Sequence, residues 1–182
     1  INQVKFIKMA YPGFKYEIFS TGLDIHRFKN ITRNEARDLL KLDKNKKYIL
    51  YVGKLYKYKQ VDKLIEIWLE IKKSKPETEL LIVGNEEKGK WGEEYYDLAE
   101  RSGAIIVGRV LNIELYKYYC AADVYVLLNL RDDYFGGIGI APLESLACNT
   151  PVVSNSLKNY LGPNLKEIGE IPESLEDYKN SI

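Results

Sequence analysis

Short runs of consecutive apolar residues recur along the chain, and several of them end in glycine. Runs of this kind occupy 48–53, 80–84, 105–108, 124–128 and 151–154. Unbroken apolarity is typical of strands that are buried on both faces, as the strands of parallel sheets are. The pattern therefore predicts five buried parallel strands, and 167–169 are expected to add a last strand at the sheet edge.

The segments between these runs have helical periodicity. Val61, Leu64 and Trp68 stand at positions i, i+3 and i+7, which places them on one face of a helix. Shorter helices are predicted at 93–101, 112–121, 143–147 and 172–182. Strands that alternate with helices predict an α/β fold, here a Rossmann-like, doubly wound parallel sheet flanked by helices with right-handed crossovers.

The first 45 residues have a weaker pattern, in which we expect a short strand and one helix. Thr32 and Glu35 have the spacing of a capping box, which predicts a helix over 33–42. We therefore treat 1–45 as a lead-in segment and 46–182 as one Rossmann-like domain.

Composition narrows the classes of function. The 182 residues weigh 21.0 kDa and carry a net charge of +1, which gives no electrostatic reason to expect nucleic acid as a partner. Two cysteines and one histidine are too few for a disulfide scaffold or a metal site rich in these ligands. No apolar run approaches the roughly 18 residues of a membrane span and no signal peptide opens the chain, so we expect a cytoplasmic protein. Because the chain begins with Ile1, we expect it to be a piece of a longer protein.

Glycines follow the carboxyl ends of most predicted strands. They are Gly53, Gly84, Gly108 and the group Gly136, Gly137 and Gly139. Ligands of open parallel sheets bind along this edge, where glycine lets the backbone approach the ligand, although a turn also needs glycine for conformational reasons alone. The last group runs into a helix with Pro142 near its first turn, and the N–H groups at such a helix start suit a phosphate.

Three charged side chains near this edge each have two interpretations. Glu144, just inside the last of these helices, either helps to cap that helix or accepts hydrogen bonds from a ribose, as acidic residues do in dinucleotide folds. Lys54 and Lys59, which follow the first strong strand, are either solvated surface lysines or the cations that neutralise a diphosphate. The residues alone leave these interpretations open.

A second glycine motif has a feature that argues against its apparent function. Residues 84–90 have the G-x-x-x-x-G-K spacing of a P-loop, but Trp91 stands where Ser or Thr would hold Mg²⁺. No G-x-G-x-x-G follows the first strong strand either. A nucleoside triphosphatase and a nicotinamide-dependent dehydrogenase are therefore both disfavoured.

Several short segments of the chain, taken together, resemble the C-terminal, donor-binding half of the GT-B retaining glycosyltransferases called glycosyltransferase group 1. The resemblance runs nearly end to end. Its most specific part is 139–153, which is similar to the family's pattern "GfGl..lEAmAcGtPVv". The weaker blocks arrive in the family's order at 20–28, 51–59, 81–84 and 121–126.

The resemblance implies roles for individual residues. Lys54 and Lys59 fall on the Arg and Lys that contact the donor diphosphate, and Glu144 falls on the glutamate that binds the ribose. The backbone of Gly139 and Ile140 would face the phosphates. Gly108, Arg109 and Val110 would form the turn near the base. The other positions on the side of the sugar donor are Gly53 and Gly137.

Two departures from the family pattern concern the donor. Lys54 replaces the usual Arg, which keeps the charge and loses the planar fork. The family has a second glutamate eight positions before the ribose-binding one, touching the donor sugar, and Gly136 stands at that position here. Asp133 supplies the carboxylate instead if extra residues are inserted in this loop. Loss and displacement of the carboxylate both stay open.

The resemblance implies a retaining glycosyltransferase that transfers a hexose from a nucleoside-diphosphate sugar to a glycan, a lipid-linked sugar or a small molecule. It implies no metal and no other cofactor. The acceptor site would lie in an N-terminal domain outside this chain, so this part alone is expected not to transfer sugar, and the full-length enzyme is expected to associate peripherally with a membrane. Two alternatives stay open: a non-catalytic nucleotide-binding module, and another GT-B enzyme such as a nucleotide-sugar epimerase.

Overall fold

The computed structural model describes residues 22–28, 31–55, 59–84, 93–128, 139–155, 169–170, 172 and 174–182. The strands are β1 (Lys47–Val52), β2 (Thr78–Val83), β3 (Ile105–Gly108), β4 (Val124–Leu127), β5 (Val152–Ser154) and β6 (Gly169–Glu170). The α-helices are α2 (Arg33–Leu40), α3 (Val61–Ser74), α4 (Glu93–Ser102), α5 (Leu115–Ala121), α6 (Ala141–Ala147) and α7 (Leu175–Ser181). Two short 3-10 turns are η1 (Ile25–Arg27) and η3 (Asn112–Glu114).

The strands of the described residues form one parallel sheet in the order β3-β2-β1-β4-β5-β6. The chain builds outward from β1 to β2 and β3, then returns to the other side of β1 and continues with β4, β5 and β6. This order confirms the predicted doubly wound sheet. The order in which strands are added reverses between β1 and β4, which are parallel neighbours. At such a switch point the connections after the two strands leave on opposite faces of the sheet, and this opens a crevice for a ligand.

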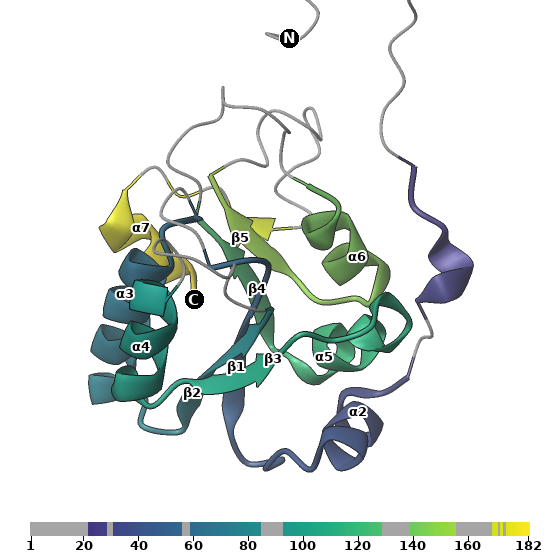
Figure 1. Ribbon diagram of the computed structural model, residues 1–182, viewed down its shortest axis with the longest axis horizontal. Coiled ribbons are helices and arrows are strands. Elements are labelled where there is room, and N and C mark those ends of the chain that lie inside the picture. Colours follow the sequence, from purple (N-terminus) through teal and green to yellow (C-terminus); the bar gives the residue numbers. More distant parts are fainter. Residues whose placement is uncertain are drawn as a thin grey trace, which may run out of the picture.

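Helices cover both faces of the sheet (Figure 1). α3, α4 and α7 lie on one face, and α2, α5 and α6 lie on the other. α3 buries the face that the sequence predicts, including Val61, Leu64 and Trp68. The polar atom of the largest of these side chains is also satisfied, because Trp68 Nε1 donates a hydrogen bond to the Thr78 carbonyl at 3.1 Å.

The predicted capping box at the start of α2 is present. The Thr32 hydroxyl accepts from the Glu35 N–H, and the Glu35 carboxylate accepts from the Thr32 N–H. α2 ends at Leu40, two residues earlier than predicted, because Lys41 takes the left-handed conformation with φ of 55°. The Lys41 N–H then donates back to carbonyls of the last turn, which closes the helix.

Three other boundaries differ from the prediction. The helix expected over 112–121 divides into η3 and α5. The final helix begins at Leu175, because the Ser174 side chain accepts from an N–H of its first turn and caps it there. Of the expected edge strand 167–169, Gly169 pairs with β5 as part of β6, and 167–168 lie outside the described residues.

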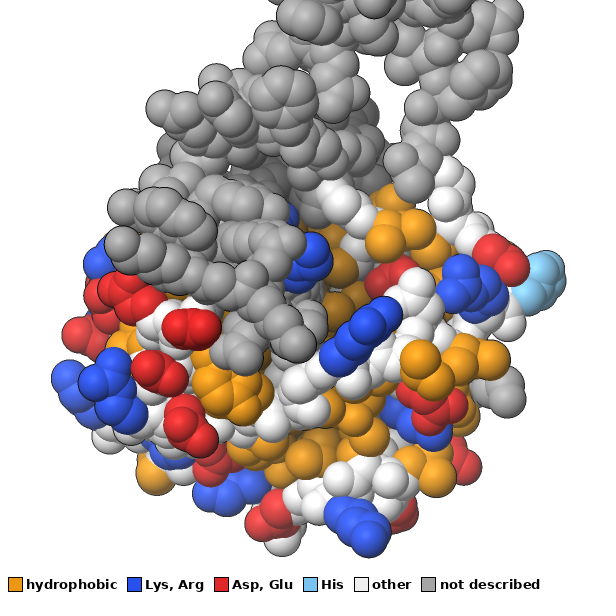
Figure 2. Space-filling view, viewed as in Figure 1, with side chains coloured by type: hydrophobic (Ala, Val, Ile, Leu, Met, Phe, Trp, Pro, Cys, Tyr) orange, Lys and Arg blue, Asp and Glu red, His pale blue; other side chains and the backbone are white. Residues whose placement is uncertain are grey.

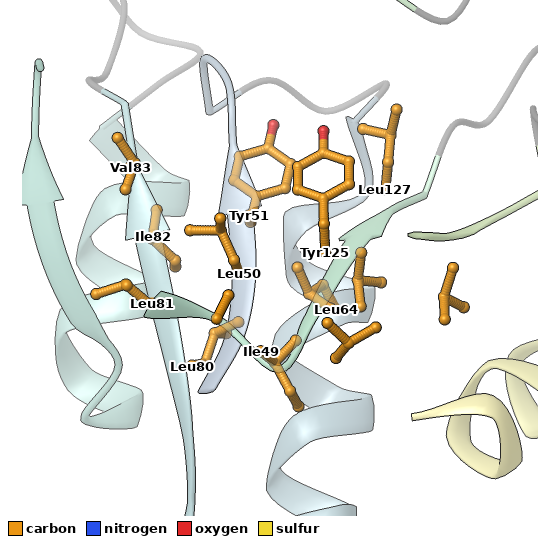
Figure 3. Close-up of a cluster of buried hydrophobic side chains, with 14 of the residues drawn as sticks. Ile49, Leu50, Tyr51, Leu64, Leu80, Leu81, Ile82, Val83, Tyr125 and Leu127 are labelled. Carbon is orange, nitrogen blue, oxygen red and sulfur yellow. The ribbon is translucent and has the colours of Figure 1, made fainter. Parts of the chain in front are cut away.

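The core fills the space between the sheet and its helices. In Figure 3 the side chains of Tyr51 on β1 and Tyr125 on β4 both have their hydroxyls toward the carboxyl ends of the strands. Cys120 and Cys148 are not joined in a disulfide and both are buried, as the sequence leads us to expect of small core residues.

Gly84, which follows β2, is required by close packing. A Cβ atom at this position would lie 1.9 Å from the Gly53 carbonyl oxygen, and its φ of 145° is one that side chains rarely adopt. Its N–H donates to the Gly108 carbonyl at 2.8 Å. The glycine that opens the P-loop-like segment therefore has a structural role of its own, and 85–90 lie outside the described residues.

A buried ion pair fastens α2 to the sheet. Arg37 is only 3 % exposed, and its Nη2 donates to Asp123 Oδ2 at 2.7 Å. The other guanidinium nitrogens donate to the carbonyl oxygens of Ala121, Lys44 and Lys46 at 3.0–3.1 Å. α2 also packs against α5, so part of the lead-in segment is joined to the core. The domain division at residue 45 stays a prediction.

Arg37→Met should lower the free energy of unfolding by about 3–5 kcal/mol, because the Asp123 carboxylate loses its buried cation and three carbonyls each lose a donor. Arg33 provides the matched control: it also pairs with Asp123, at 3.2 Å, but its side chain is 45% exposed. Arg33→Met should cost less than about 1 kcal/mol. Urea unfolding of both variants measures the difference, and equal losses would contradict this assignment.

Candidate functional site

The candidate site lies along the carboxyl edge of the sheet, at the switch point between β1 and β4. β1 is followed by Gly53 and then leads to α3 on one face, whereas β4 leads to α6 on the other. The predicted site residues are distributed over the connections that follow β1, β3 and β4. Three of them, Asp133, Gly136 and Gly137, lie outside the described residues.

The connection after β1 carries the two predicted lysines. The Tyr51 hydroxyl donates to the Lys54 carbonyl at 2.8 Å, which holds the backbone directly after the strand. The Lys54 side chain is exposed. Lys59 is half-buried just before α3, and burial lowers the pKa of its ammonium group below the usual 10.5. The structure thus places both lysines after the β1 end of the crevice, one in solvent and one partly withdrawn from it.

The connection after β3 carries the predicted base-side turn. Gly108 has φ of 79°, and its carbonyl accepts from the Gly84 N–H. Arg109 is exposed and Val110 is half-buried. β3 lies two strands from β1, which corresponds to about 10 Å along the edge. The turn and the lysines therefore share one edge without being neighbours.

The start of α6 carries the remaining predicted residues. Gly139 has φ of 75°, in the left-handed region that favours glycine, and Ile140 directly precedes the helix. Both are exposed. Pro142 is buried in the first turn, as predicted for a proline at a helix start. Glu144 is only 8 % exposed.

The Glu144 side chain contacts a tyrosine and does not cap its helix. Tyr119, on α5, donates its hydroxyl hydrogen to Glu144 Oε2 at 2.8 Å, and both groups are buried. α6 has no side-chain cap hydrogen bond at its start. No Lys or Arg of the described residues forms an ion pair with this carboxylate. Among the residues that the structure describes, Glu144 is therefore a buried acceptor with one neutral hydrogen-bond donor.

Sequence reasoning missed Tyr119. Its ring contacts that of Tyr125 edge to face, with centroids 6.0 Å apart. Its backbone carbonyl accepts from the Thr150 hydroxyl at 2.6 Å. A signal was available in the pattern, because Leu115 and Tyr119 stand four residues apart on the buried face of α5, but that spacing indicates only burial.

Tyr125 differs from Tyr119 in its hydrogen bonding. Its hydroxyl is fully buried and has no hydrogen-bond partner within the part of the chain that the structure describes. Burial raises the pKa of both tyrosines above the usual value of 10, and for Tyr119 the neighbouring Tyr125 and Glu144 add to the effect. Both hydroxyls thus stay protonated near neutral pH.

Other classes of site find little support among the described residues. No group of three or more His, Cys, Asp and Glu side chains there comes together as metal ligands. None of the described helices has the length and apolarity to cross a bilayer. On the face shown in Figure 2, basic and acidic side chains are interspersed, without the single-sign field that attracts nucleic acid.

Comparison with known proteins agrees with this geometry. A family model described as "Glycosyl transferases group 1" matches residues 32–162, which is most of the chain. The chain belongs to the glycosyl transferases group 1 family. The predicted family is thereby confirmed at the level of group 1.

The relatives of this glycosyltransferase chain are longer than it is. D-inositol 3-phosphate glycosyltransferase from Segniliparus rotundus is 29% identical over 175 residues, which cover 92% of this chain and 35% of that protein. The protein of the same name from Corynebacterium aurimucosum is 28% identical over 155 residues, covering 81% and 34%. The chain thus spans about a third of the length of these curated relatives.

Solved structures show the same fold. Sucrose-phosphate synthase from Thermosynechococcus elongatus superimposes with a TM-score of 0.76 at 23% identity, over 98% of this chain and 46% of that one. HepE from Anabaena, in complex with UDP and glucose, gives 0.71 at 17% identity, over 91% and 45%. The predicted fold class, the Rossmann-like half of a GT-B glycosyltransferase, is confirmed.

The two buried tyrosines of this glycosyltransferase chain should respond oppositely to loss of the hydroxyl. Tyr119→Phe should lower the free energy of unfolding by about 1.5–3 kcal/mol, because a buried carboxylate loses its donor. Tyr125→Phe should leave stability unchanged or raise it, because its buried hydroxyl has no partner to lose among the described residues. Thermal and urea unfolding measure both changes. A destabilisation by Tyr125→Phe equal to that of Tyr119→Phe would show that Tyr125 has a partner.

Proposed function

We propose that this chain is the donor-binding half of a retaining glycosyltransferase, which transfers a hexose from a nucleoside-diphosphate sugar to an acceptor. Family membership and the Rossmann-like fold support the transferase class. The observation that carries the proposal is Glu144, a buried carboxylate on the helix that follows the switch point, with one neutral donor and no ion pair among the described residues. Retention and the hexose come from the resemblance to the GT-B enzymes.

Glu144 would accept hydrogen bonds from the ribose of the donor. Lys54 and Lys59, after β1, would neutralise the diphosphate, and the backbone of Gly139 and Ile140 would face its oxygens. These groups act where negative charge develops as the nucleoside diphosphate departs, so they would stabilise the transition state as well as the bound donor. We propose no metal requirement, because the two lysines supply the positive charge.

The other positions complete the donor site. Gly108, Arg109 and Val110 would lie against the base, at the β3 side of the edge. Gly53 would let the β1 loop approach the diphosphate. The remaining three positions would form the loop at the donor sugar: Asp133, Gly136 and Gly137.

Acceptor contacts would come from the part of the enzyme that this chain does not include. The chain spans about a third of the length of its curated relatives, and we propose that it holds the donor only. Orientation of two reactants contributes roughly 7–11 kcal/mol to catalysis, which a donor site alone cannot supply. The acceptor would be a glycan, a lipid-linked sugar or a small molecule, with the full-length enzyme cytoplasmic and peripheral to the membrane.

The experiment that tests the function is nucleotide binding by this chain. Calorimetric titration with UDP, GDP and ADP should show binding of at least one, with equal affinity in Mg²⁺ and in EDTA. UDP is the first probe, because HepE and Staphylococcus aureus TarM were both solved with it. Glu144→Ala should weaken binding by about 1.5–3 kcal/mol, the contribution of hydrogen bonds to a charged group.

Glu176 provides the matched control for this experiment. It also lies in the first turn of a helix, α7, but its side chain is 68% exposed and outside the candidate site. Glu176→Ala should bind nucleotide as the wild type does. A strict Mg²⁺ requirement, or normal binding by Glu144→Ala, would refute the proposed site.

The half-buried position of Lys59 predicts that nucleotide binding depends on pH. Because burial lowers the pKa of Lys59, the free protein loses this charge at a lower pH than an exposed lysine, whose usual pKa is 10.5. A bound diphosphate favours the charged form, so affinity should fall as pH rises through the lowered pKa. Lys59→Arg stays charged and should not show this fall, whereas the exposed Lys54→Arg should keep it.

Titrations from pH 7 upward compare the three proteins, and any ionisation of the nucleotide itself is common to all of them. The same alkaline loss of affinity in wild type and Lys59→Arg would place Lys59 outside the diphosphate site.

A further inference from the structure

The hydrogen bond between Tyr119 and Glu144 has a consequence for how the carboxylate can be used. Tyr119 Oη occupies Oε2, at 2.8 Å, while no hydrogen bond to Oε1 comes from the described residues. An ionised carboxylate only accepts hydrogen bonds, so a partner at Oε1 has to be a hydrogen-bond donor. Within the described part of the chain, the carboxylate is therefore held at Oε2 and has no donor at Oε1.

The environment of Glu144 indicates which kind of hydrogen-bond donor would suit Oε1. A buried carboxylate with a purely structural role is normally paired with a cation or fully hydrogen-bonded. Glu144 has neither in the described part of the chain, and its one donor is a neutral hydroxyl. Burial raises the pKa of the Tyr119 phenol, so this donor keeps its proton near neutral pH. A second neutral hydroxyl, such as one from a ribose, would give the Glu144 carboxylate a second hydrogen-bond donor without adding charge to the site.

Tyr119 is itself held in place from several sides. Its ring meets that of Tyr125 with centroids 6.0 Å apart, and its carbonyl accepts from the Thr150 hydroxyl at 2.6 Å. Ser145, which follows Glu144 on α6, donates through its hydroxyl to the Thr150 carbonyl at 2.9 Å. α5 and α6 are thus joined both through the side chains of Tyr119 and Glu144 and through Thr150.

We propose that Tyr119 is a positioning residue that fixes Glu144 through Oε2, so that the carboxylate selects nucleotides by their ribose hydroxyls. This inference rests on the proposed function, because it assigns a task to the same glutamate. Tyr119 does not touch the nucleotide. Its loss frees the carboxylate to rotate, so that a ribose and a deoxyribose are bound with more similar affinities.

The test compares nucleotides that differ by one hydroxyl. Wild type, Tyr119→Phe and Tyr125→Phe are each titrated with UDP, 2′-deoxy-UDP and 3′-deoxy-UDP, or with the corresponding set for whichever base the chain binds. The wild type should prefer the ribonucleotide over at least one deoxynucleotide by about tenfold or more. Tyr119→Phe should reduce that preference to below about threefold.

Tyr125→Phe is the matched control, because it removes a hydroxyl from the adjacent buried ring. Its hydroxyl has no hydrogen-bond partner in the described part of the chain, so the preference for ribose should remain as in the wild type. If Tyr119→Phe does not fold, 4-aminophenylalanine at position 119 replaces it. That side chain keeps the ring and a weaker donor and should give an intermediate preference.

The outcomes separate this inference from the proposed function. If Tyr119→Phe binds all three nucleotides more weakly but keeps the wild-type preference, Tyr119 is only structural, and the proposed function stands without this inference. An unchanged preference with 4-aminophenylalanine at position 119 has the same meaning. If the wild type binds none of the nucleoside diphosphates, the proposed function itself fails and this inference fails with it.

Discussion

The rest of the structure depends on the hydrogen bonds that the Asp123 carboxylate accepts. It lies directly before β4 and accepts both from Arg37 at 2.7 Å and from the Tyr48 N–H of β1 at 2.8 Å. The Asp123 N–H in turn donates to the Tyr48 carbonyl at 2.9 Å. These bonds set the pairing of β1 with β4, and the crevice opens between those two strands. A structural ion pair at one end of the strands therefore determines the geometry of the candidate site at the other end.

The candidate site is stabilised in a different way from the core. Apolar strands and helices need only the right volume and period, and small changes of shape are absorbed. Glu144 instead depends on individual hydrogen bonds. Tyr119 donates to its carboxylate, the Thr150 hydroxyl donates to the Tyr119 carbonyl, and the Ser145 hydroxyl donates to the Thr150 carbonyl. Each partner of this network is buried, so loss of one leaves another unsatisfied. The precision of the carboxylate comes from this network.

The sequence predicted what is decided locally. Apolar runs identified β1 to β5 as strands, although β3 at the sheet edge is only partly buried and not buried as predicted. Thr32 with Glu35 identified the start of α2, because a capping box spans one turn. Contacts between distant residues were not predicted. Tyr119 and Glu144 are 25 residues apart, and Arg37 and Asp123 are 86 apart, so no window of the sequence contains both partners. Glu144 was singled out, but the residue that holds it could only be found in three dimensions.

The Glu144 carboxylate, which forms no ion pair among the described residues, also bears on how such a chain evolves. Replacement of both Glu144 and Tyr119 by apolar residues of similar size would remove a buried carboxylate together with its donor, and changes of that kind commonly stabilise a fold. Selection for stability alone would therefore tend to replace the two residues together. A chain with this carboxylate, whose partner among the described residues is a neutral hydroxyl and not a cation, carries a trade-off between stability and function in one pair of side chains.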